Sequence, residues 1–472
     1  MIAGEKDQGL DCFSILVGKN ASVDGAVLFA HNEDDGGLQI VNLYRVPRQT
    51  NDAGKAITMK NGGELPRPEE TNAYFWFQMP KMNFGDGYFN EFGVVIASDA
   101  CPSREDKPEL TDGGIIYWLR RAMAEQAHSA REAVHIAGNL VEKYGYASSG
   151  RTYVIADAKE GWMFSAVHGK HWVAKRVPDD EVAVLPNYYT IGEVDLSDTT
   201  NYLGSADLID YAIQRGWYDP QRDGKFHFAK VYSNPGSLKH PGNIHRMWRG
   251  VCLVSGLPFN LNDDFSFSVK PKKKLAPQDL MRVLRDHYEG TELDNTDHYK
   301  LGNPYLLNRS TICANSTQYS FVAQLRDWMP KELGCVLWMA LRRPDSHGFV
   351  PLYLGTQKIP DGFSYDDWET SLEKHFSPPD YYYEKRDDHG FWAHWKLADW
   401  VDQDYQNRIY AVQKIWGDFE KSEFEMQPGF EKKMEMIFKK DRADALRLIT
   451  DYSDGWLLKS WEKCVSLVPK EE

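Results

Sequence analysis

The chain has 472 residues, of which 42% are hydrophobic and 26% charged, an ordinary composition for a globular protein. The formal net charge of −14 argues against nucleic acid as a partner, because phosphate binding needs a basic surface. No apolar run approaches the length of a membrane span, and the N-terminus lacks the apolar segment of a signal peptide, so no membrane partner is expected.

Residues 1–11 are polar, have no apolar periodicity and offer nothing to a hydrophobic core, so they are predicted to be a removable leader. Cys12 follows directly, just ahead of an apolar run at residues 15–17 that predicts a buried strand. A lone cysteine before a strand is usually a small buried hydrophobe. A thiol beside ionisable groups near a chain end favours the other interpretation, a nucleophile.

The next element brings ionisable groups to Cys12. A second apolar run, residues 26–30, follows a turn with the sequence Ser-Val-Asp-Gly, and two such runs joined by a Gly-containing turn predict a β-hairpin. The hairpin returns the end of its second strand to the start of the first. Cys12 is therefore expected to lie near His31, Asn32 and Asp34.

Strands and helices then follow in blocks rather than in alternation. After further short strands, helices are predicted at residues 115–127 and 130–144, the second with a capping box formed by Ser129 and Glu132. The next predicted strands are residues 152–156, 161–165, 171–174 and 182–185. This order, in which two consecutive helices separate two groups of strands, is typical of an α+β fold with antiparallel sheets and helices outside.

The second half of the chain differs from the first in its composition and in its predicted elements. Residues 216–262 are rich in Gly, Pro, Trp and His and are predicted to wrap the core. The later predicted elements are a helix at 277–287, strands at 310–325 and 335–341, and helices at 363–376, 392–421 and 428–464. We expect one body, residues 12–360, with a helical C-terminal extension, residues 361–472, packed on it.

The spacing of the cysteines bears on metal binding, and their expected redox state bears on the cellular compartment of the protein. The six cysteines are scattered, and no two have the spacing of a zinc site or of a disulfide framework. Neither is therefore indicated, and catalysis by a cysteine nucleophile would need no metal or other cofactor. Reduced thiols favour the cytoplasm, with export left open if the N-terminus was trimmed from a longer precursor.

A nucleophilic Cys12 needs a base, and two are available. Among the 14 histidines, only His31 is tied to Cys12 by local structure. The alternative base is the α-amine of Cys12 itself, which would be freed by removal of residues 1–11 and would titrate at roughly 7.7–8.0. In that case the Cys12 thiol would cut the preceding peptide bond by attacking the carbonyl of Asp11.

Several blocks of sequence carry a family resemblance. The segment that starts with Cys-Phe-Ser-Ile-Leu-Val-Gly-Lys at residue 12 and continues to Ala-His-Asn-Glu-Asp at 30–34 resembles the start of the dipeptidase D family, peptidase family C69. These are cysteine peptidases of the N-terminal nucleophile hydrolase superfamily, similar to secernins, penicillin V acylase and bile salt hydrolases. Later blocks, such as Asn-Glu-Phe-Gly-Val at 90–94 and Leu-Pro-Asn at 185–187, agree. The resemblance implies a four-layer αββα sandwich.

The resemblance also assigns roles to residues. Cys12 matches the N-terminal nucleophile, Asp34 the aspartate that holds its α-amine, and Asn187 the asparagine whose amide helps to form the oxyanion hole. His31 stands where the family usually has arginine, and it could donate a hydrogen bond near the thiolate. The substrate-binding candidates are His31, Asn32, Asp99 and Arg309. Asn187 and Asp99 keep the alternative of turn or cap residues, and Arg309 that of a surface arginine.

Taken together, the residues and the resemblance predict a cysteine dipeptidase of broad specificity that hydrolyses small peptides. One alternative is an N-acyl amide hydrolase like penicillin V acylase and the bile salt hydrolases. The other is a non-catalytic, secernin-like interaction protein that keeps residues 1–11. A homo-oligomer is left open.

Overall fold

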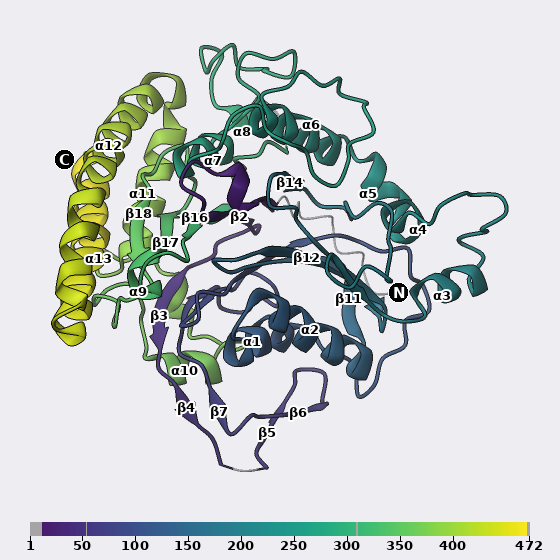
Figure 1. Ribbon diagram of the computed structural model, residues 1–472. Coiled ribbons are helices and arrows are strands. Elements are labelled where there is room, and N and C mark those ends of the chain that lie inside the picture. Colours follow the sequence, from purple (N-terminus) through teal and green to yellow (C-terminus); the bar gives the residue numbers. More distant parts are fainter. Residues whose placement is uncertain (1–11, 53, 308–309, 470–472) are drawn as a thin grey trace.

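The computed structural model describes residues 12–52, 54–307 and 310–469 (Figure 1). Two large antiparallel sheets lie face to face in this part of the chain, and helices cover the outer face of each. The predicted removable leader, residues 1–11, and the candidate Arg309 lie outside the described residues.

The first sheet has six strands in the order β14-β1-β2-β16-β17-β18. Their bounds are β14 (Val182–Leu185), β1 (Phe13–Val17), β2 (Val27–Asp34), β16 (Thr317–Leu325), β17 (Cys335–Leu341) and β18 (Val350–Tyr353). The predicted hairpin is confirmed, because β1 and β2 pair with Phe13 opposite Asn32. Strand β14 pairs with the other edge of β1, so β1 is hydrogen-bonded to a neighbouring strand on both sides.

The second sheet has eight strands in the order β15-β13-β12-β11-β10-β9-β8-β3. Their bounds are β15 (Tyr202–Gly204), β13 (Trp172–Arg176), β12 (Gly161–Gly169), β11 (Tyr146–Ala156), β10 (Val95–Ala100), β9 (Gly87–Asn90), β8 (Tyr74–Gln78) and β3 (Asn42–Val46). Two small two-stranded ribbons lie apart from it, β4 (Gln49–Thr50) with β7 (Glu70–Thr71) and β5 (Ala56–Thr58) with β6 (Glu64–Pro66).

Three apolar layers hold this arrangement together. Side chains such as Leu16, Phe29 and Val154 fill the space between the two sheets. Helices α1 (Tyr117–Gln126) and α2 (Ala130–Tyr144) bury their apolar faces on the outside of the eight-stranded sheet. Helices α6 (Pro241–Ser255) and α7 (Pro277–Leu284) do the same on the six-stranded sheet. The predicted αββα sandwich is therefore confirmed, and its doubly covered strands explain why β1 is buried on both faces.

Helix α2 has the predicted bounds, and the backbone N–H of Glu132 donates to Ser129 Oγ at 3.2 Å. Helix α6 was not predicted, because residues 216–262 were interpreted as a wrapping segment. The shorter helices are α3 (Leu208–Gln214), α4 (Phe228–Tyr232), α5 (Pro235–Lys239), α8 (Pro304–Leu307), α9 (Lys331–Gly334) and α10 (Trp368–Glu373), with 3-10 turns η1 (Lys19–Ala21) and η2 (Asp380–Tyr383).

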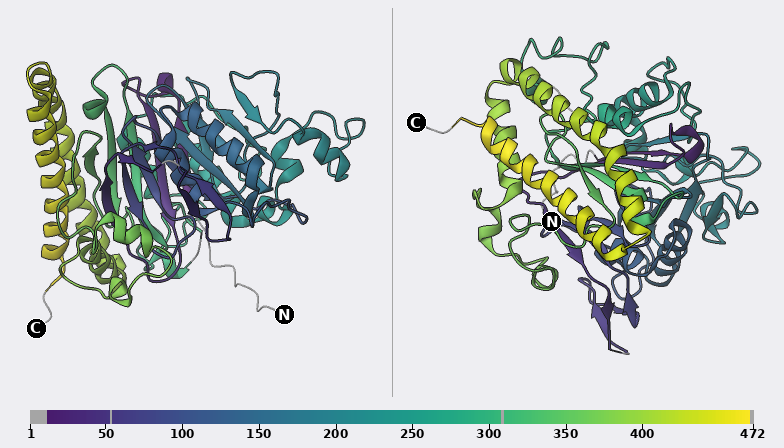
Figure 2. Two further views of the ribbon diagram at one scale, coloured as in Figure 1. Left: turned by 90° about the horizontal axis from the view of Figure 1, so that it is seen from below. Right: turned by 60° about the vertical axis from the view of Figure 1, so that its left-hand side comes forward.

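The C-terminal part contains the long helices α11 (Gly390–Gln403), α12 (Tyr405–Phe438) and α13 (Arg442–Leu467). Figure 2 shows α12 and α13 side by side along one edge of the molecule, where α13 packs on β18. The predicted helix break before Pro428 is wrong, since α12 runs through that proline. A proline inside a helix costs about 3 kcal/mol. Phe424, stacked on Trp338, and Phe430, stacked on Tyr452, help to offset this cost.

The boundary at residue 360 between a core body and an extension stays a prediction. Within the described residues, no helix combines the length and the apolar character that crossing a membrane would require.

Candidate active site

The β1–β2 hairpin places Cys12 against the end of β2. Cys12 directly precedes β1, and its side chain is buried. Its Sγ lies 3.6 Å from Glu33 Oε1 and 3.6 Å from the backbone oxygen of Asp34. The side chain of Asp34, the predicted holder of the α-amine, is buried at the same end of β2. The hairpin thus brings Cys12 to the end of β2 as expected, but the side chain in contact with the thiol is that of Glu33, which the sequence analysis did not single out.

These surroundings keep the thiol protonated. Burial raises the pKa of Cys12 well above its ordinary value, and the nearby charges of Glu33, Asp99, Asp34 and Asp35 raise it further. A thiolate is the nucleophilic form of cysteine. A base must therefore take the Cys12 proton when substrate is present.

Among the described residues, His31 is linked to the thiol through Glu33. Its Nε2 lies 3.0 Å from Glu33 Oε2, and its Nδ1 lies 2.8 Å from Ser14 Oγ. Ser14 donates its own proton to Asp99 Oδ2 at 2.6 Å, so Nδ1–H must be the donor to Ser14. A buried chain Cys12–Glu33–His31–Ser14–Asp99 results.

The pKa values of the two carboxyls in this chain are shifted in opposite directions. Burial raises the pKa of Glu33, but the hydrogen bond and charge of His31 and the charges of Arg120 and Arg151 outweigh it and leave the pKa below its ordinary value. Burial raises the pKa of Asp99 to about 6. Glu33 is thus a carboxylate and a weak base, which makes it a poor acceptor for the thiol proton.

The side chain of Asn32 serves the packing of the sheet. Its Nδ2 donates to the backbone oxygens of Leu284 at 3.0 Å and Ile312 at 2.8 Å, and its Oδ1 accepts from Ser320 at 2.6 Å. Asn32 and His31 are neighbours on a strand, so their side chains point to opposite faces of the sheet. This geometry supports a role for Asn32 in anchoring α7 and the segment before β16 to β2.

Replacing Asn32 with alanine is therefore expected to affect stability more than chemistry. Two buried carbonyls and the Ser320 hydroxyl would lose their partner, which costs at least about 2 kcal/mol of the free energy of unfolding. Urea unfolding of Asn32→Ala measures the loss, with Asn407→Ala on the exposed face of α12 as the matched control. A variant of unchanged stability that hydrolyses substrate slowly would instead show direct contact with the substrate.

Asn187 offers a hydrogen-bond donor beside Cys12. It follows β14, whose Leu185 pairs with Ser14, so Asn187 sits near the start of β1. Its Oδ1 accepts from Arg246 Nη2 at 2.9 Å. Because arginine can only donate, this contact fixes which end of the amide faces Arg246. The buried Nδ2 has no hydrogen-bond partner in the described part of the chain and is free to donate to an arriving oxyanion.

Arg246 joins the two sides of this site, and sequence reasoning missed it. Its Nη1 donates to the backbone oxygen of Cys12 at 3.0 Å, while its Nη2 holds Asn187 and Asn243. The signals of its helix were present in the sequence. Pro241 stands at the first helical position, Gly256 ends the helix, and apolar residues recur between them at helical spacing.

A second buried cluster has the residue types of a metal site. His287, Cys313 and Asp345 each offer a ligand atom, and these atoms lie within 4.8 Å of one another. The hydroxyl of Tyr305 lies among them, 2.9 Å from His287 Nε2, 3.4 Å from Cys313 Sγ and 2.8 Å from Asp345 Oδ2. The three groups are thus satisfied by a protein hydroxyl.

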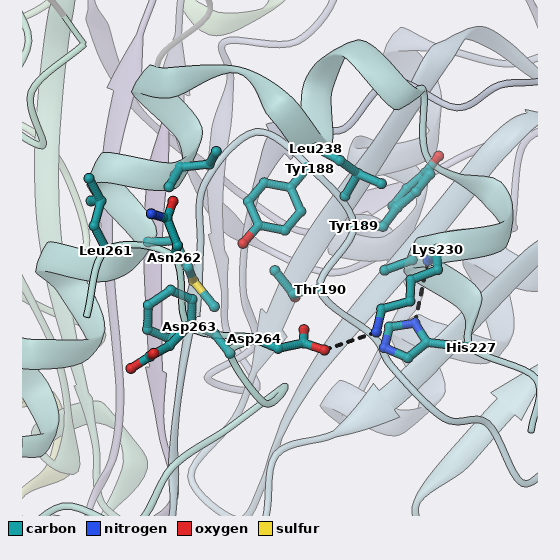
Figure 3. Close-up of a pocket in the computed structure, with 14 residues that line it drawn as sticks. Tyr188, Tyr189, Thr190, His227, Lys230, Leu238, Leu261, Asn262, Asp263 and Asp264 are labelled. Atoms are coloured by element: carbon teal, nitrogen blue, oxygen red, sulfur yellow. Dashed lines mark hydrogen bonds and ion pairs between the residues drawn. The ribbon is translucent and has the colours of Figure 1, made fainter. Parts of the chain in front are cut away.

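A surface pocket of about 240 Å³ begins at the residue after Asn187 (Figure 3). Tyr188 and Thr190 line it together with His227 and the ion pair between Lys230 and Asp264. Among the described residues, no hydrogen bond or ion pair joins this lining to Cys12. The pocket borders the loop that carries Asn187, and its lining includes Met247, the residue after Arg246.

Comparison with known proteins places the chain in a family. The family model described as Peptidase family C69 matches residues 11–418, and the chain therefore belongs to that family.

The curated relatives have consistent names. A probable dipeptidase of Latilactobacillus sakei is 28% identical over 358 residues, which are 72% of this chain and 74% of the relative. A probable dipeptidase of Salmonella dublin is 27% identical, covering 74% and 82%. Probable dipeptidase B of Streptococcus pyogenes serotype M1 is 27% identical, covering 73% and 72%.

Among solved structures, a mutant of the conjugated bile acid hydrolase from Clostridium perfringens matches with 15% identity and a TM-score of 0.31. The match covers 73% of this chain and 92% of that one.

Proposed function

We propose that this member of peptidase family C69 is a cysteine dipeptidase whose nucleophile is Cys12, made N-terminal by removal of residues 1–11. The observation that carries the proposal is that Arg246 binds both the backbone oxygen of Cys12, whose thiol is buried, and the Oδ1 of Asn187, whose buried Nδ2 is uncommitted. A nucleophile beside a fixed amide donor is the arrangement that acyl transfer requires. The names of the relatives support dipeptides as the substrate class.

The raised pKa of Cys12 favours the α-amine as the base. Glu33 offers a titratable acceptor in contact with the thiol, but its lowered pKa makes it too weak to hold the thiol proton. An α-amine titrates at roughly 7.7–8.0, close to the working pH. Asp34, at the same end of β2, is proposed to hold that amine in place.

The proposed reaction has two halves. The α-amine takes the Cys12 proton, the sulfur bonds to the carbonyl carbon of the substrate, and Asn187 Nδ2 donates to the oxyanion that forms. The C–N bond then breaks, and the leaving amine takes the proton from the Cys12 ammonium. Water hydrolyses the remaining thioester, with the same α-amine as base.

Asp35 is the proposed contact for the α-ammonium of the dipeptide. Its carboxyl is buried, and no described residue forms a hydrogen bond or ion pair with it. Burial and the charge of Glu33 raise its pKa. An arriving ammonium would pair with this carboxyl and restore its ionised form. Asp99 is already committed to Ser14, so it is the weaker candidate for the amine.

We expect a free amine on the substrate to matter. A charged hydrogen bond contributes about 1.5–3 kcal/mol, so N-acetylation of the dipeptide should lower kcat/KM by at least about tenfold. The assay compares a free dipeptide, its N-acetyl form and a conjugated bile salt on the same preparation. Faster cleavage of the acetylated or bile salt substrate would replace this proposal with an N-acyl amide hydrolase.

A further inference from the structure

Arg151, on β11, is a buried cation without a carboxylate partner. Its side chain is only 3% exposed, and in the part of the chain that the structure describes no ion pair includes it. Its Nη1 donates to the backbone oxygen of Ser98 at 3.3 Å and to Ser98 Oγ at 3.0 Å. The guanidinium also lies over the ring of Phe84, with Cζ 3.9 Å from the ring centroid.

Several other buried arginines of this fold are neutralised, although Arg342, like Arg151, has no ion pair among the described residues. Arg121 pairs with Glu125 at 2.7 Å, Arg326 with Glu431 at 2.6 Å and Arg343 with Asp402 at 2.8 Å. Burying a charge without such a partner is costly, and proteins usually avoid it. An unpaired buried guanidinium is therefore a site to which an anion can be added.

The free edge of Arg151 has the geometry of a carboxylate receptor. Ser98 and Phe84 engage Nη1 and one face of the guanidinium, whereas no described residue accepts from Nε or Nη2. Nε and Nη2 donate in parallel from one edge, and two parallel N–H groups match the two oxygens of a carboxylate. Phe84 and Ser98 hold that edge in one orientation.

Arg151 belongs to the same end of the sandwich as Cys12. Its neighbour Thr152 pairs with Asp99, which accepts from Ser14, two residues after Cys12. The charge of Arg151 also acts on the carboxyls of Glu33 and Asp35.

The short segment before β9 links Arg151 with the proposed amine site. Phe84 stacks on Arg151, and at the next residue, Gly85, a Cβ would come within 2.9 Å of Asp35 Oδ2. The unpaired guanidinium of Arg151 and the unpaired carboxyl of Asp35 therefore lie next to two adjacent residues, Phe84 and Gly85.

We propose that Arg151 binds the free α-carboxylate of the dipeptide substrate through Nε and Nη2, opposite the ammonium bound by Asp35. The assignment rests on the proposed function and deepens it, because two anchors for two chain ends define the length of the substrate. A longer peptide would place a neutral amide or a further residue against Arg151. The guanidinium would then stay unpaired, which disfavours that substrate.

The test uses alanyl-alanine and its C-terminal amide, which differ only in the charge that Arg151 is proposed to read. Wild-type protein should prefer the free dipeptide by about 10- to 100-fold in kcat/KM. Arg151→Gln should bring the ratio close to one, mainly through KM. The matched control is Arg120→Gln, because Arg120 also contacts Ser98 and lies in the same network but has its donors committed to Asp86 and Ser98. It should slow both substrates equally.

Equal losses on both substrates in Arg151→Gln would overturn the assignment. Phe84→Leu provides a second variant if Arg151→Gln does not fold, and it should lower the preference several-fold by loosening the guanidinium. Calorimetric binding of the dipeptide with a reduced peptide bond, and of its amide, to the wild-type protein and to Arg151→Gln separates the two proposals. Arg151-dependent preference for the free carboxylate without any hydrolysis would overturn the dipeptidase reaction alone, whereas equal binding would overturn the role of Arg151.

Discussion

The Cys12→Ala variant is expected to show no measurable dipeptide hydrolysis and to keep residues 1–11 attached. Both results have one cause, because the same thiol is proposed to cut the bond between Asp11 and Cys12 and to attack the substrate. The wild-type protein should begin at Cys12 and be lighter than its translated sequence by the mass of residues 1–11. Intact-mass spectrometry of the two proteins, with an assay of the same samples, measures both effects.

The control for this variant is Cys252→Ala, which removes a half-buried thiol of α6 without touching the hairpin. It should be processed and active like the wild type. An active wild-type protein that still carries residues 1–11 would eliminate the α-amine as base. Glu33 and His31 would then be the remaining candidates for the base. An inactive wild-type protein that still carries residues 1–11 would favour the non-catalytic alternative.

The parts of the site that sequence reasoning located are those fixed by short-range structure. A turn and two apolar runs determine the β1–β2 hairpin, and the hairpin alone brings Cys12 to Glu33 and Asp34. Its side-chain alternation separates His31 and Glu33 from Asn32. The family resemblance added Asn187, which no local pattern would have selected over other turn residues.

The parts that were missed depend on contacts between distant segments. Arg246 donates to an oxygen 234 residues earlier in the chain, and periodicity in one segment says nothing about such a pair. Arg151 was overlooked for a similar reason, since an arginine in a strand pattern gives no sign that it lacks a carboxylate. Arg309, the arginine selected from the sequence, lies outside the described residues, so its role stays a prediction.

Helix boundaries were least predictable where packing overrides local preference. Pro428 was expected to begin a helix, but α12 continues through it because apolar side chains on both sides of the proline pack on the six-stranded sheet and on α13. The fold class itself was accessible because it depends on the order of strands and helices, which local patterns report well.

Replacing Asn187 tests the oxyanion donor, and Asn187→Asp does so with the least disturbance. The aspartate keeps an oxygen for Arg246 Nη2 but has no N–H to donate, so the Arg246 contact with Cys12 should survive. Loss of one oxyanion donor lowers kcat by about 10²–10³, and we expect that loss in both Asn187→Asp and Asn187→Ala with unchanged thermal unfolding. KM should change little, because the donor acts on charge that develops only in the transition state.

Asn243→Ala is the matched control for this prediction. Asn243 accepts from the same Arg246 nitrogen and donates to the backbone oxygen of Asn187, but no oxyanion role is proposed for it. Its loss should cost less than about tenfold in kcat, as expected for a residue that only positions its neighbours. If kcat falls by less than about fivefold in both Asn187 variants, Asn187 is only a turn residue. The oxyanion would then need another donor, and backbone N–H groups near Cys12 would be the groups to examine.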